Sequence, residues 1–403
     1  MSDHIPEAIV QDILHRLTLK DIVKCMSVCK TWNNMIKSHT YISSHLKRTL
    51  SSPTPPHFLL RHLLPSRKEH YSICSSSFDK IDNIQYSFPN EEILTLVGVI
   101  NGVVCLSDDY YRLTDDIVLW NPLIQRHLRL PTPLITAETL GDDYIFKLGF
   151  GFDYVKNDFK VVRLCYTLRE YAVPPTVELY SLNESAWRII DASYLDVRVI
   201  GSIQCFFHGN VHWLAYEDTP KKFTKSSVQK CILMFNAVEE RFNKMELPEE
   251  VTKSSMWWPD LVICVIDGCL SLIKYPKDSS PIFNLWMRKD SWSQVYAICL
   301  NEGFKSLWGI FSSQYPGRIS HYDSHNEIMS LHSLDLKSQD KHTDIQYIVE
   351  EFCAYDYRES LVLLDKESSV AMLGQNEESS ESLKMVGQKR RRESSVGPNP
   401  KSD

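Results

Sequence analysis

The 403-residue sequence contains no long apolar run. Its most apolar stretch, LVICVIDGCLSLI at residues 261–273, is interrupted by Asp267 and is too short to cross a bilayer. The amino-terminal stretch MSDHIPEAIVQDILHRL carries charges throughout and lacks the apolar centre of a signal peptide. These absences argue against membrane-spanning and secreted proteins, and we expect a soluble, cytoplasmic protein with no membrane partner.

Cysteine pairs of the form CxxC are also missing, although the chain has 11 cysteines. Structural zinc sites usually need such pairs, so we expect no bound metal. Most of the cysteines stand inside apolar runs, such as Cys105 in VVCLS and Cys165 in VVRLCY. This placement is typical of reduced cysteines that serve as small core residues.

Catalytic motifs are absent as well. The segment GFGF at residues 149–152 lacks the third glycine and the following helix of a dinucleotide-binding loop, and no G-x-S-x-G occurs. The pairs His208/His212 and His321/His325 are not accompanied by further ligands in any metal-binding motif, so we interpret them as structural or surface residues. We predict no catalytic residues and no cofactor; an enzyme on the same fold is the less favoured alternative.

Positive charge is concentrated at the two ends of the chain. The net charge is −7, with +3 on residues 1–50 and +3 on residues 389–403, which leaves −13 for residues 51–388. An acidic body does not suit nucleic-acid binding but suits a basic protein partner. Acidic pairs near predicted turns are candidate contacts for such a partner, with ordinary solvated loop charges as the alternative. These residues are Asp108, Asp109, Asp115, Asp116, Asp142 and Asp143.

Three short helices are predicted in the first 45 residues. Pro6 stands where a helix starts without losing a hydrogen bond, and Thr18 is expected to cap the second helix with Asp21 in its first turn. The third helix is expected from Cys29 to Ser38. So small a unit is marginal alone, and its apolar positions exceed the needs of its own interior. It is either a cap packed on the body or, as we favour, a docking surface for another protein.

Residues 51–70, which begin SSPTPPH, are predicted to be a linker, and residues 71–365 contain a loose repeat. Each unit has an apolar strand, a second strand that ends in an aromatic residue, a tight turn and a return strand. The aromatic residues that precede the turns are Trp120, Tyr180, Phe235, Trp286 and Tyr322. This pattern predicts an α+β multidomain chain whose body is a six-bladed propeller-like ring, with a β-sandwich as the alternative. Strands from both ends of the body, in residues 71–88 and in residues 350–364, which end in ESLVLL, are expected to share the sixth blade.

The last segment, residues 366–403, is poor in large apolar residues and is predicted to be disordered. It contains the basic run QKRRRES, which is a candidate nuclear-localisation signal, with a functionally silent tail as the alternative. The candidate residues are Lys389, Arg390, Arg391 and Arg392.

Several quoted segments resemble known families. IPEAIVQDILHRL and VCKTW resemble the F-box, which assigns residues 1–50 to an F-box head. LWNP with LRLP, GFGFDYVKNDFKVVRL, VELYSLNESAW, VHWLA and ESLVLL resemble the plant F-box-associated, kelch-like domain over residues 71–365. The strongest likeness is to the S-locus F-box and S-haplotype-specific F-box group.

This resemblance implies a substrate-recognition subunit of an SCF-type ubiquitin ligase. The head would bind an acidic Skp-type adaptor, which joins it to a cullin, and the body would capture a protein for ubiquitination. The target could be an S-ribonuclease in pollen self-incompatibility; the alternative is a general receptor in signalling or stress. Carried over by position, the adaptor-binding residues are Ile5, Pro6, Ile9, Ile13, Leu14, Leu17, Val28, Cys29, Lys30 and Trp32.

Overall fold

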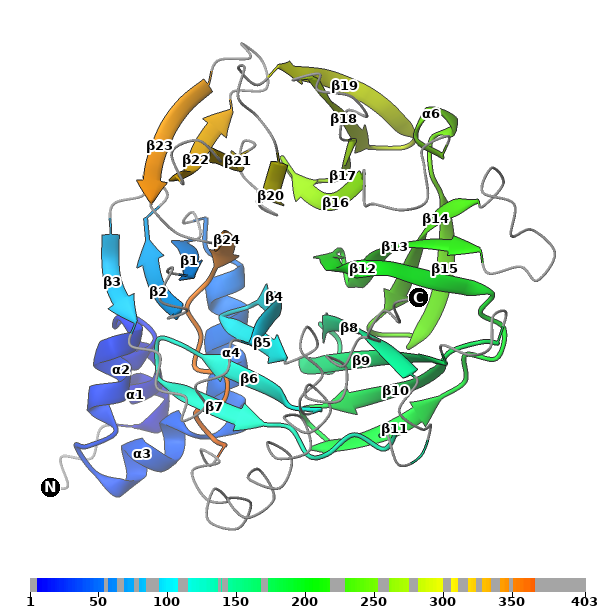
Figure 1. Cartoon of the computed structure of the whole chain (residues 1–403). Coiled ribbons are helices and arrows are strands. Elements are labelled where there is room, and N and C mark those ends of the chain that lie inside the picture. The colour runs from blue at the N-terminus through cyan, green and yellow to red at the C-terminus, as the bar shows by residue number, and fades with distance from the viewer. Residues whose placement is uncertain are drawn as a thin grey trace, which may run out of the picture. The chain divides into compact units, whose positions relative to one another are not determined.

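The computed structural model describes much of the chain between residues 6 and 366, and Figure 1 shows its elements. Residues 1–365 form one compact unit, and of the second unit, 366–403, only Lys366 is described. The strands between residues 306 and 347 are described by their backbone alone. The described ranges are 6–53, 57–63, 69–75, 80–84, 94–107, 115–136, 139, 144–167, 173–217, 229–252, 261–274, 282–299, 306–310, 318–323, 328–334, 341–347 and 351–366. No helix in these ranges has the length and apolar content to cross a membrane.

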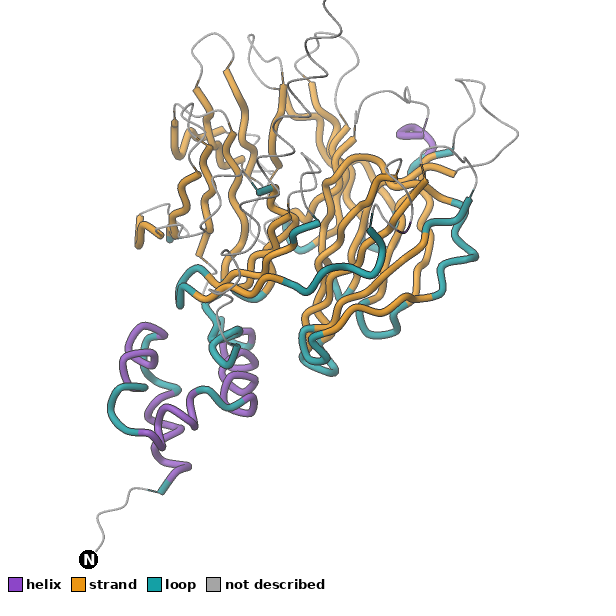
Figure 2. The backbone as a smooth tube through the Cα atoms, turned by 60° about the horizontal axis from the view of Figure 1, so that its bottom comes forward, coloured by secondary structure: helices purple, strands orange, loops and turns teal. Residues whose placement is uncertain are grey.

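The head, residues 6–50 of the described chain, contains four helices. They are α1 (Glu7–Leu14), α2 (Leu19–Cys25), α3 (Lys30–Ile36) and α4 (His39–Leu50). The predicted cap of the second helix is confirmed, because Thr18 Oγ1 accepts a hydrogen bond from Asp21 N at 3.3 Å. Figure 2 shows the head helices, in purple, gathered at one end of the orange strands of the body.

Helix α4 is the one that the sequence prediction missed. It begins after Ser38, whose Oγ accepts a hydrogen bond from Tyr41 N at 3.2 Å, and it buries Tyr41, Ile42, His45 and Leu46. These positions repeat at helical spacing, but one of them is a histidine and the residues around them are polar, which obscures the apolar stripe. The prediction of three helices is therefore wrong by one.

The described strands pair into six four-stranded antiparallel sheets. The first contains β1 (His57–Leu63), β2 (Glu69–Cys74), β3 (Lys80–Ile84) and β24 (Glu351–Tyr357), and the second β4 (Thr95–Ile100), β5 (Val103–Ser107), β6 (Ile117–Asn121) and β7 (Arg126–Arg129). The third contains β8 (Tyr144–Asp153), β9 (Asp158–Thr167), β10 (Thr176–Ser181) and β11 (Ala186–Ile190), and the fourth β12 (Val197–Phe207), β13 (Asn210–Glu217), β14 (Lys230–Asn236) and β15 (Arg241–Glu246).

After the short helix α6 (Glu249–Thr252), the fifth sheet contains β16 (Leu261–Ile266), β17 (Cys269–Lys274), β18 (Ile282–Arg288) and β19 (Trp292–Cys299). The sixth contains β20 (Ser306–Ile310), β21 (Arg318–Asp323), β22 (Ile328–Leu334) and β23 (Lys341–Tyr347). Of the six blades expected from the sequence, five sheets therefore have described side-chain packing, and the sheet of β20–β23 has described backbone pairing only.

The first sheet joins strands from the two ends of the body, as the sequence predicts. β24 pairs antiparallel with β1, and Phe58 lies opposite Asp356. The strand that makes this pairing, however, lies inside the predicted linker 51–70, so that boundary is wrong. The apolar run Phe58–Leu60 is only three residues long and follows PTPP, which gives a weak strand signal. Its burial comes from pairing with β2 on one side and β24 on the other.

The turn-preceding aromatic residues lie in equivalent strands of four sheets. Trp120, Tyr180, Phe235 and Trp286 stand in the third strands, β6, β10, β14 and β18, respectively. Tyr322 stands in β21, the second strand of its sheet, so the fifth repeat was predicted out of phase. This difference accounts for the short spacing between the last two aromatic residues.

Tight turns join the first and second strands of several sheets. In the pairs Asn101-Gly102 and Asp267-Gly268 both residues have positive φ, 49° with 80° and 50° with 65°. Two consecutive positive values define the two-residue hairpin turn that favours Asn-Gly and Asp-Gly. The glycines at these two turns are therefore explained by the positive φ that the turn requires.

The sheets are arranged radially. The first strands of neighbouring sheets contact one another, β24 with β4, β4 with β8, β8 with β12, β12 with β16, and β20 with β24. Figure 1 shows the sheets around a common centre. Every residue of β16 is buried, as expected for a strand between neighbouring sheets. The propeller interpretation is confirmed, and the β-sandwich alternative is not favoured.

Candidate functional site

The inward faces of the four helices contribute buried apolar residues to one core cluster, which continues into residues 361–364 and into the second and third sheets of the body. Because these side chains are buried, they hold the head together and are not available to a partner. The buried apolar residues are Val10, Leu14, Leu19, Ile22, Met35, Ile36, Tyr41, Ile42 and Leu46.

Most of the predicted adaptor-binding residues are exposed, namely Pro6, Ile9, Ile13, Leu17, Val28, Cys29 and Lys30. The four large apolar members, Ile9, Ile13, Leu17 and Val28, are between 37% and 62% exposed, and we call them the head patch. Ile9 and Ile13 are four residues apart and share one face of α1. Four exposed large apolar side chains within residues 9–28 make this part of the head a candidate interaction surface.

The other predicted adaptor-binding residues are placed differently. Leu14 is fully buried in the head core, so it supports the surface rather than belonging to it. Trp32 is half-buried and packs against the same core. Ile5 lies outside the described residues. Helical spacing alone does not show that Leu14 is buried and Ile13 exposed. The two residues are adjacent at the edge of the apolar stripe, and only the packing of the other helices decides which one is covered.

A stack of three rings joins α1 to α4. The ring of Tyr41 lies 4.7 Å from that of His15 and 6.4 Å from that of His45, measured between centroids. Burial, with the charges of His15 and Arg48, lowers the pKa of His45 to about 4, and burial also lowers the pKa of His15. The imidazole of His45 is therefore neutral at pH 7. The sequence pattern alone does not indicate this stack.

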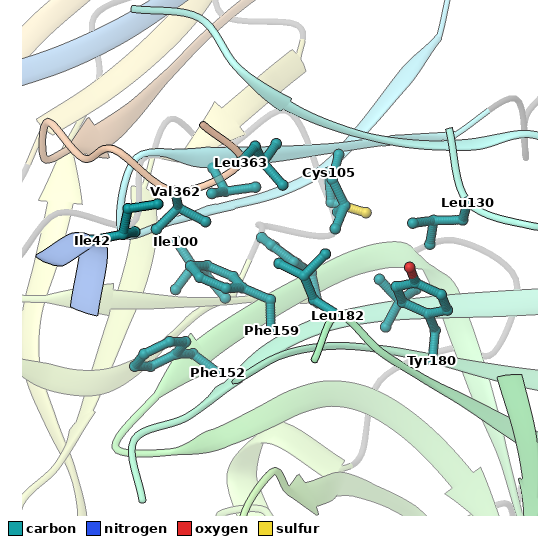
Figure 3. Close-up of a cluster of buried hydrophobic side chains, with 14 of the residues drawn as sticks. Ile42, Ile100, Cys105, Leu130, Phe152, Phe159, Tyr180, Leu182, Val362 and Leu363 are labelled. Atoms are coloured by element: carbon teal, nitrogen blue, oxygen red, sulfur yellow. The ribbon is translucent and has the colours of Figure 1, made fainter. Parts of the chain in front are cut away.

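The head is attached to the body by residues Arg358–Leu364, which follow β24 and which we call the strap. Arg358 Nη1 donates a hydrogen bond to the carbonyl oxygen of Thr49 in α4 at 3.3 Å. Leu361, Val362, Leu363 and Leu364 are buried in one cluster with residues of α4 and of the second and third sheets. Figure 3 shows Val362 and Leu363 in this cluster together with Ile42 of the head.

The strap is not a strand, although its residues ESLVLL were predicted to be part of one. β24 ends at Tyr357, and the carbonyl oxygens of the strap are bound by a side chain: Asn121 Nδ2 donates to Ser360 O at 2.8 Å and to Val362 O at 3.0 Å. A Cβ at Gly102 would lie 2.5 Å from the carbonyl oxygen of Arg358, so the close approach of the strap requires glycine there.

Two of the predicted acidic contact residues are described, and both pair within the body. Asp115 Oδ1 accepts a hydrogen bond from Arg163 Nη2 at 2.6 Å. Asp116 Oδ2 accepts one from Arg129 Nη1 at 2.6 Å. These internal partners neutralise the two carboxylates, so they do not support the attraction of a basic substrate. Four of the predicted residues lie outside the described ranges, namely Asp108, Asp109, Asp142 and Asp143.

Of the two histidines His208 and His212 in the fourth sheet, one is exposed and the other is buried. His212 is buried, its Nδ1 lies 3.3 Å from Cys205 O, and burial lowers its pKa to about 4. His208 is exposed in the turn between β12 and β13. In the part of the chain that the structure describes, no group of three or more His, Cys, Asp and Glu side chains is placed to hold a metal ion. The basic run Lys389–Arg392 lies outside that part.

Comparison with known proteins gives matches for both the head and the body. A family model described as F-box domain matches residues 2–43, and one described as F-box associated beta propeller domain matches residues 69–399. The F-box protein CPR1 of Arabidopsis thaliana is 28% identical over 331 residues, which are 75% of each chain. The F-box protein At3g07870 of the same plant is 31% identical over 328 residues, 73% of each chain. The F-box/kelch-repeat protein At3g23880 is 26% identical and covers 76% of this chain and 82% of its own.

Proposed function

Because the chain belongs to the F-box proteins that carry an F-box associated β-propeller domain, we propose that it is the substrate-recognition subunit of an SCF-type ubiquitin ligase. The F-box domain implies binding of a Skp-type adaptor. In the proposed complex the adaptor joins the head to a cullin, and the propeller domain captures a protein for ubiquitination.

The observation that carries this proposal is the head patch. The head helices bury their inward faces in a cluster shared with the strap and the body, yet Ile9, Ile13, Leu17 and Val28 remain exposed. Full burial of one such aliphatic side chain contributes roughly 1.5–3 kcal/mol. Covering four of them therefore supplies a substantial part of the free energy of a stable complex.

Co-purification of the full-length chain with a plant Skp-type adaptor tests the proposal. The double substitution Ile9→Asp and Ile13→Asp should abolish co-purification, because it places two charges in the apolar contact. Ile189→Asp is the control, since Ile189 is 59% exposed, against 52% for Ile9 and 45% for Ile13, but lies in β11 of the body. Retention of the adaptor by the folded double variant, at the level of the unsubstituted chain, would contradict the proposal.

For the substrate, we propose a general receptor in signalling or stress in preference to an S-ribonuclease receptor. The internal pairing of Asp115 and Asp116 supports this choice, because it removes two carboxylates that the ribonuclease hypothesis needs. Affinity capture from native tissue with the proteasome blocked tests it, with the Ile9→Asp/Ile13→Asp variant as a substrate trap. A captured basic ribonuclease and expression confined to pollen would restore the S-locus alternative.

For the location in the cell, we propose the cytoplasm, with Lys389–Arg392 as a candidate nuclear signal. The support is the sequence alone, since four consecutive basic residues suit importin recognition. A fluorescent fusion in which these four residues are replaced by alanine tests the nuclear signal. Loss of nuclear fluorescence would support the signal, and unchanged distribution would favour a silent tail.

A further inference from the structure

The turn between β8 and β9 exposes two large apolar side chains. Tyr154 is 66% exposed and Val155 67%, the highest values among the large apolar residues that the structure describes. Lys156 follows them and is exposed as well. These side chains contribute nothing to the core of the body, so their arrangement at one turn is explained better by contact with another molecule.

The turn is held in place by its own hydrogen bonds. The buried Asp153 accepts two bonds at Oδ1, from Val155 N at 2.9 Å and from Lys156 N at 3.0 Å. Asn183 Nδ2 donates to the carbonyl oxygen of Lys156 at 3.2 Å. A partner would therefore meet a preformed surface, and little ordering entropy would be lost on binding.

The same turn contacts the head. Its last residue, Asn157, donates from Nδ2 to Ser43 Oγ in α4 at 2.6 Å. The next residue of α4, Ser44, has its Oγ 3.2 Å from Nε2 of His15, which follows α1. Helix α1 carries the first two residues of the head patch. Short contacts within one compact unit thus connect the exposed turn, through α4, to His15 at the end of α1.

We propose that residues Tyr154–Lys156 form a second contact surface for the Skp-type adaptor that binds the head. This inference rests on the proposed function and identifies a part of the body that would take part in it. The surface fits an apolar patch bordered by carboxylates, because it pairs two apolar side chains with a lysine. The head carries +3, whereas residues 51–388 carry −13, so Lys156 extends the positive charge of the head onto an otherwise acidic body.

Titration of the purified full-length chain with a purified Skp-type adaptor tests the inference. The double variant Tyr154→Ser/Val155→Ser should weaken the Kd at least about tenfold, as expected for removal of two contact side chains from an interface. The matched control is Ile189→Ser/Ile203→Ser, since these residues are 59% and 54% exposed but lie in β11 and β12. The control should change the Kd by less than about twofold.

A second variant keeps the test independent of any effect on folding. Lys156→Glu should slow association with the adaptor and weaken its dependence on salt, because it reverses a charge at the contact. Adaptor affinity and association rate equal to those of the unsubstituted chain in both variants would overturn the inference. If the turn variants bind adaptor normally but lose a captured protein substrate, the surface belongs to the substrate and the inference is also wrong. Failure of the unsubstituted chain to bind adaptor would instead reject the proposed function.

Discussion

Replacing Asn121 with alanine should detach the strap, because the buried Asn121 side chain forms hydrogen bonds with Ser360, Val362 and Tyr357. Asn121 ends β6 and is fully buried. Its Nδ2 donates to Ser360 O at 2.8 Å and to Val362 O at 3.0 Å, and its Oδ1 accepts a hydrogen bond from Tyr357 Oη at 3.4 Å. Alanine would leave two carbonyl groups and one hydroxyl group without these partners.

The magnitude follows from the number of buried groups left unpaired. Each costs about 1–3 kcal/mol, so the substitution, which affects three groups, should lower the free energy of unfolding by about 3–9 kcal/mol, of a total near 5–15 kcal/mol. Asn236 provides a matched control, because it ends β14 at the equivalent position of another sheet. Its Oδ1 accepts bonds only from Val238 N and Glu239 N within its own turn, so Asn236→Ala should cost about 1 kcal/mol.

Hydrogen exchange and thermal unfolding measure this difference. Asn121→Ala should lower the Tm well below that of Asn236→Ala and speed exchange at residues 358–364. Exchange of the strap should be unchanged in Asn236→Ala. If the two variants have the same Tm and the strap remains protected in both, the hydrogen bonds of Asn121 do not hold it and the reasoning fails.

Three further predictions concern single side chains elsewhere in the molecule. Gly149→Ala should destabilise the body by about 3 kcal/mol or more in a denaturant titration, because the added Cβ would lie 2.1 Å from Trp213 Cζ2. Gly151→Ala should cost less, because the atom nearest to its added Cβ lies 3.0 Å away. Lys160→Met should cost about 3–5 kcal/mol in the same measurement, since it leaves the buried Asp153 carboxylate unpaired. Lys244→Met, which breaks an exposed pair with Asp196, should cost at most about 1 kcal/mol. The pKa of His45 is lowered to about 4 in the folded chain. Its effect on the free energy of unfolding should therefore be constant above about pH 6.5. Below that pH the free energy of unfolding should fall by about 1.4 kcal/mol per pH unit toward pH 4, because the unfolded chain binds the proton and the folded chain does not. His45→Phe should flatten this part of the pH profile in thermal unfolding, whereas an unchanged slope would contradict the assignment.

The features that could be predicted from the sequence are those with local causes. The cap of α2 depends on Thr18 and Asp21, which are three residues apart, and the turn at Asn101-Gly102 depends on two adjacent residues. The repeated hairpins have the same property, since each pairs strands that are neighbours in sequence. The head patch was predicted in part because exposed and buried positions alternate along a helix at a known spacing.

The features that were missed depend on residues far apart in sequence. The strand character of β1 comes from pairing with β24 at the other end of the body, and no local signal in residues 57–63 shows that partner. The pairing of Asp115 with Arg163 spans 48 residues, so the acidic pair appeared in the sequence as solvent-exposed loop charge. The consecutive apolar residues of the strap predict a strand, and only the hydrogen bonds of Asn121 to its carbonyl oxygens show why it is not one.

The strap also couples the two activities that the proposed function assigns to the chain. Arg358 and the buried residues that follow it contact α4, so the strap fixes the direction of the head relative to the propeller. Ubiquitin transfer requires a captured substrate to be held at a suitable position, whereas adaptor binding depends mainly on the head patch. Asn121→Ala should therefore lower the rate of substrate ubiquitination in a reconstituted ligase at saturating adaptor, and it should weaken the Kd for the adaptor by no more than the loss of the Tyr154–Lys156 contact does. The Ile9→Asp/Ile13→Asp variant should lose both. A full ubiquitination rate in Asn121→Ala, with the strap shown by exchange to be detached, would mean that the strap does not position the substrate.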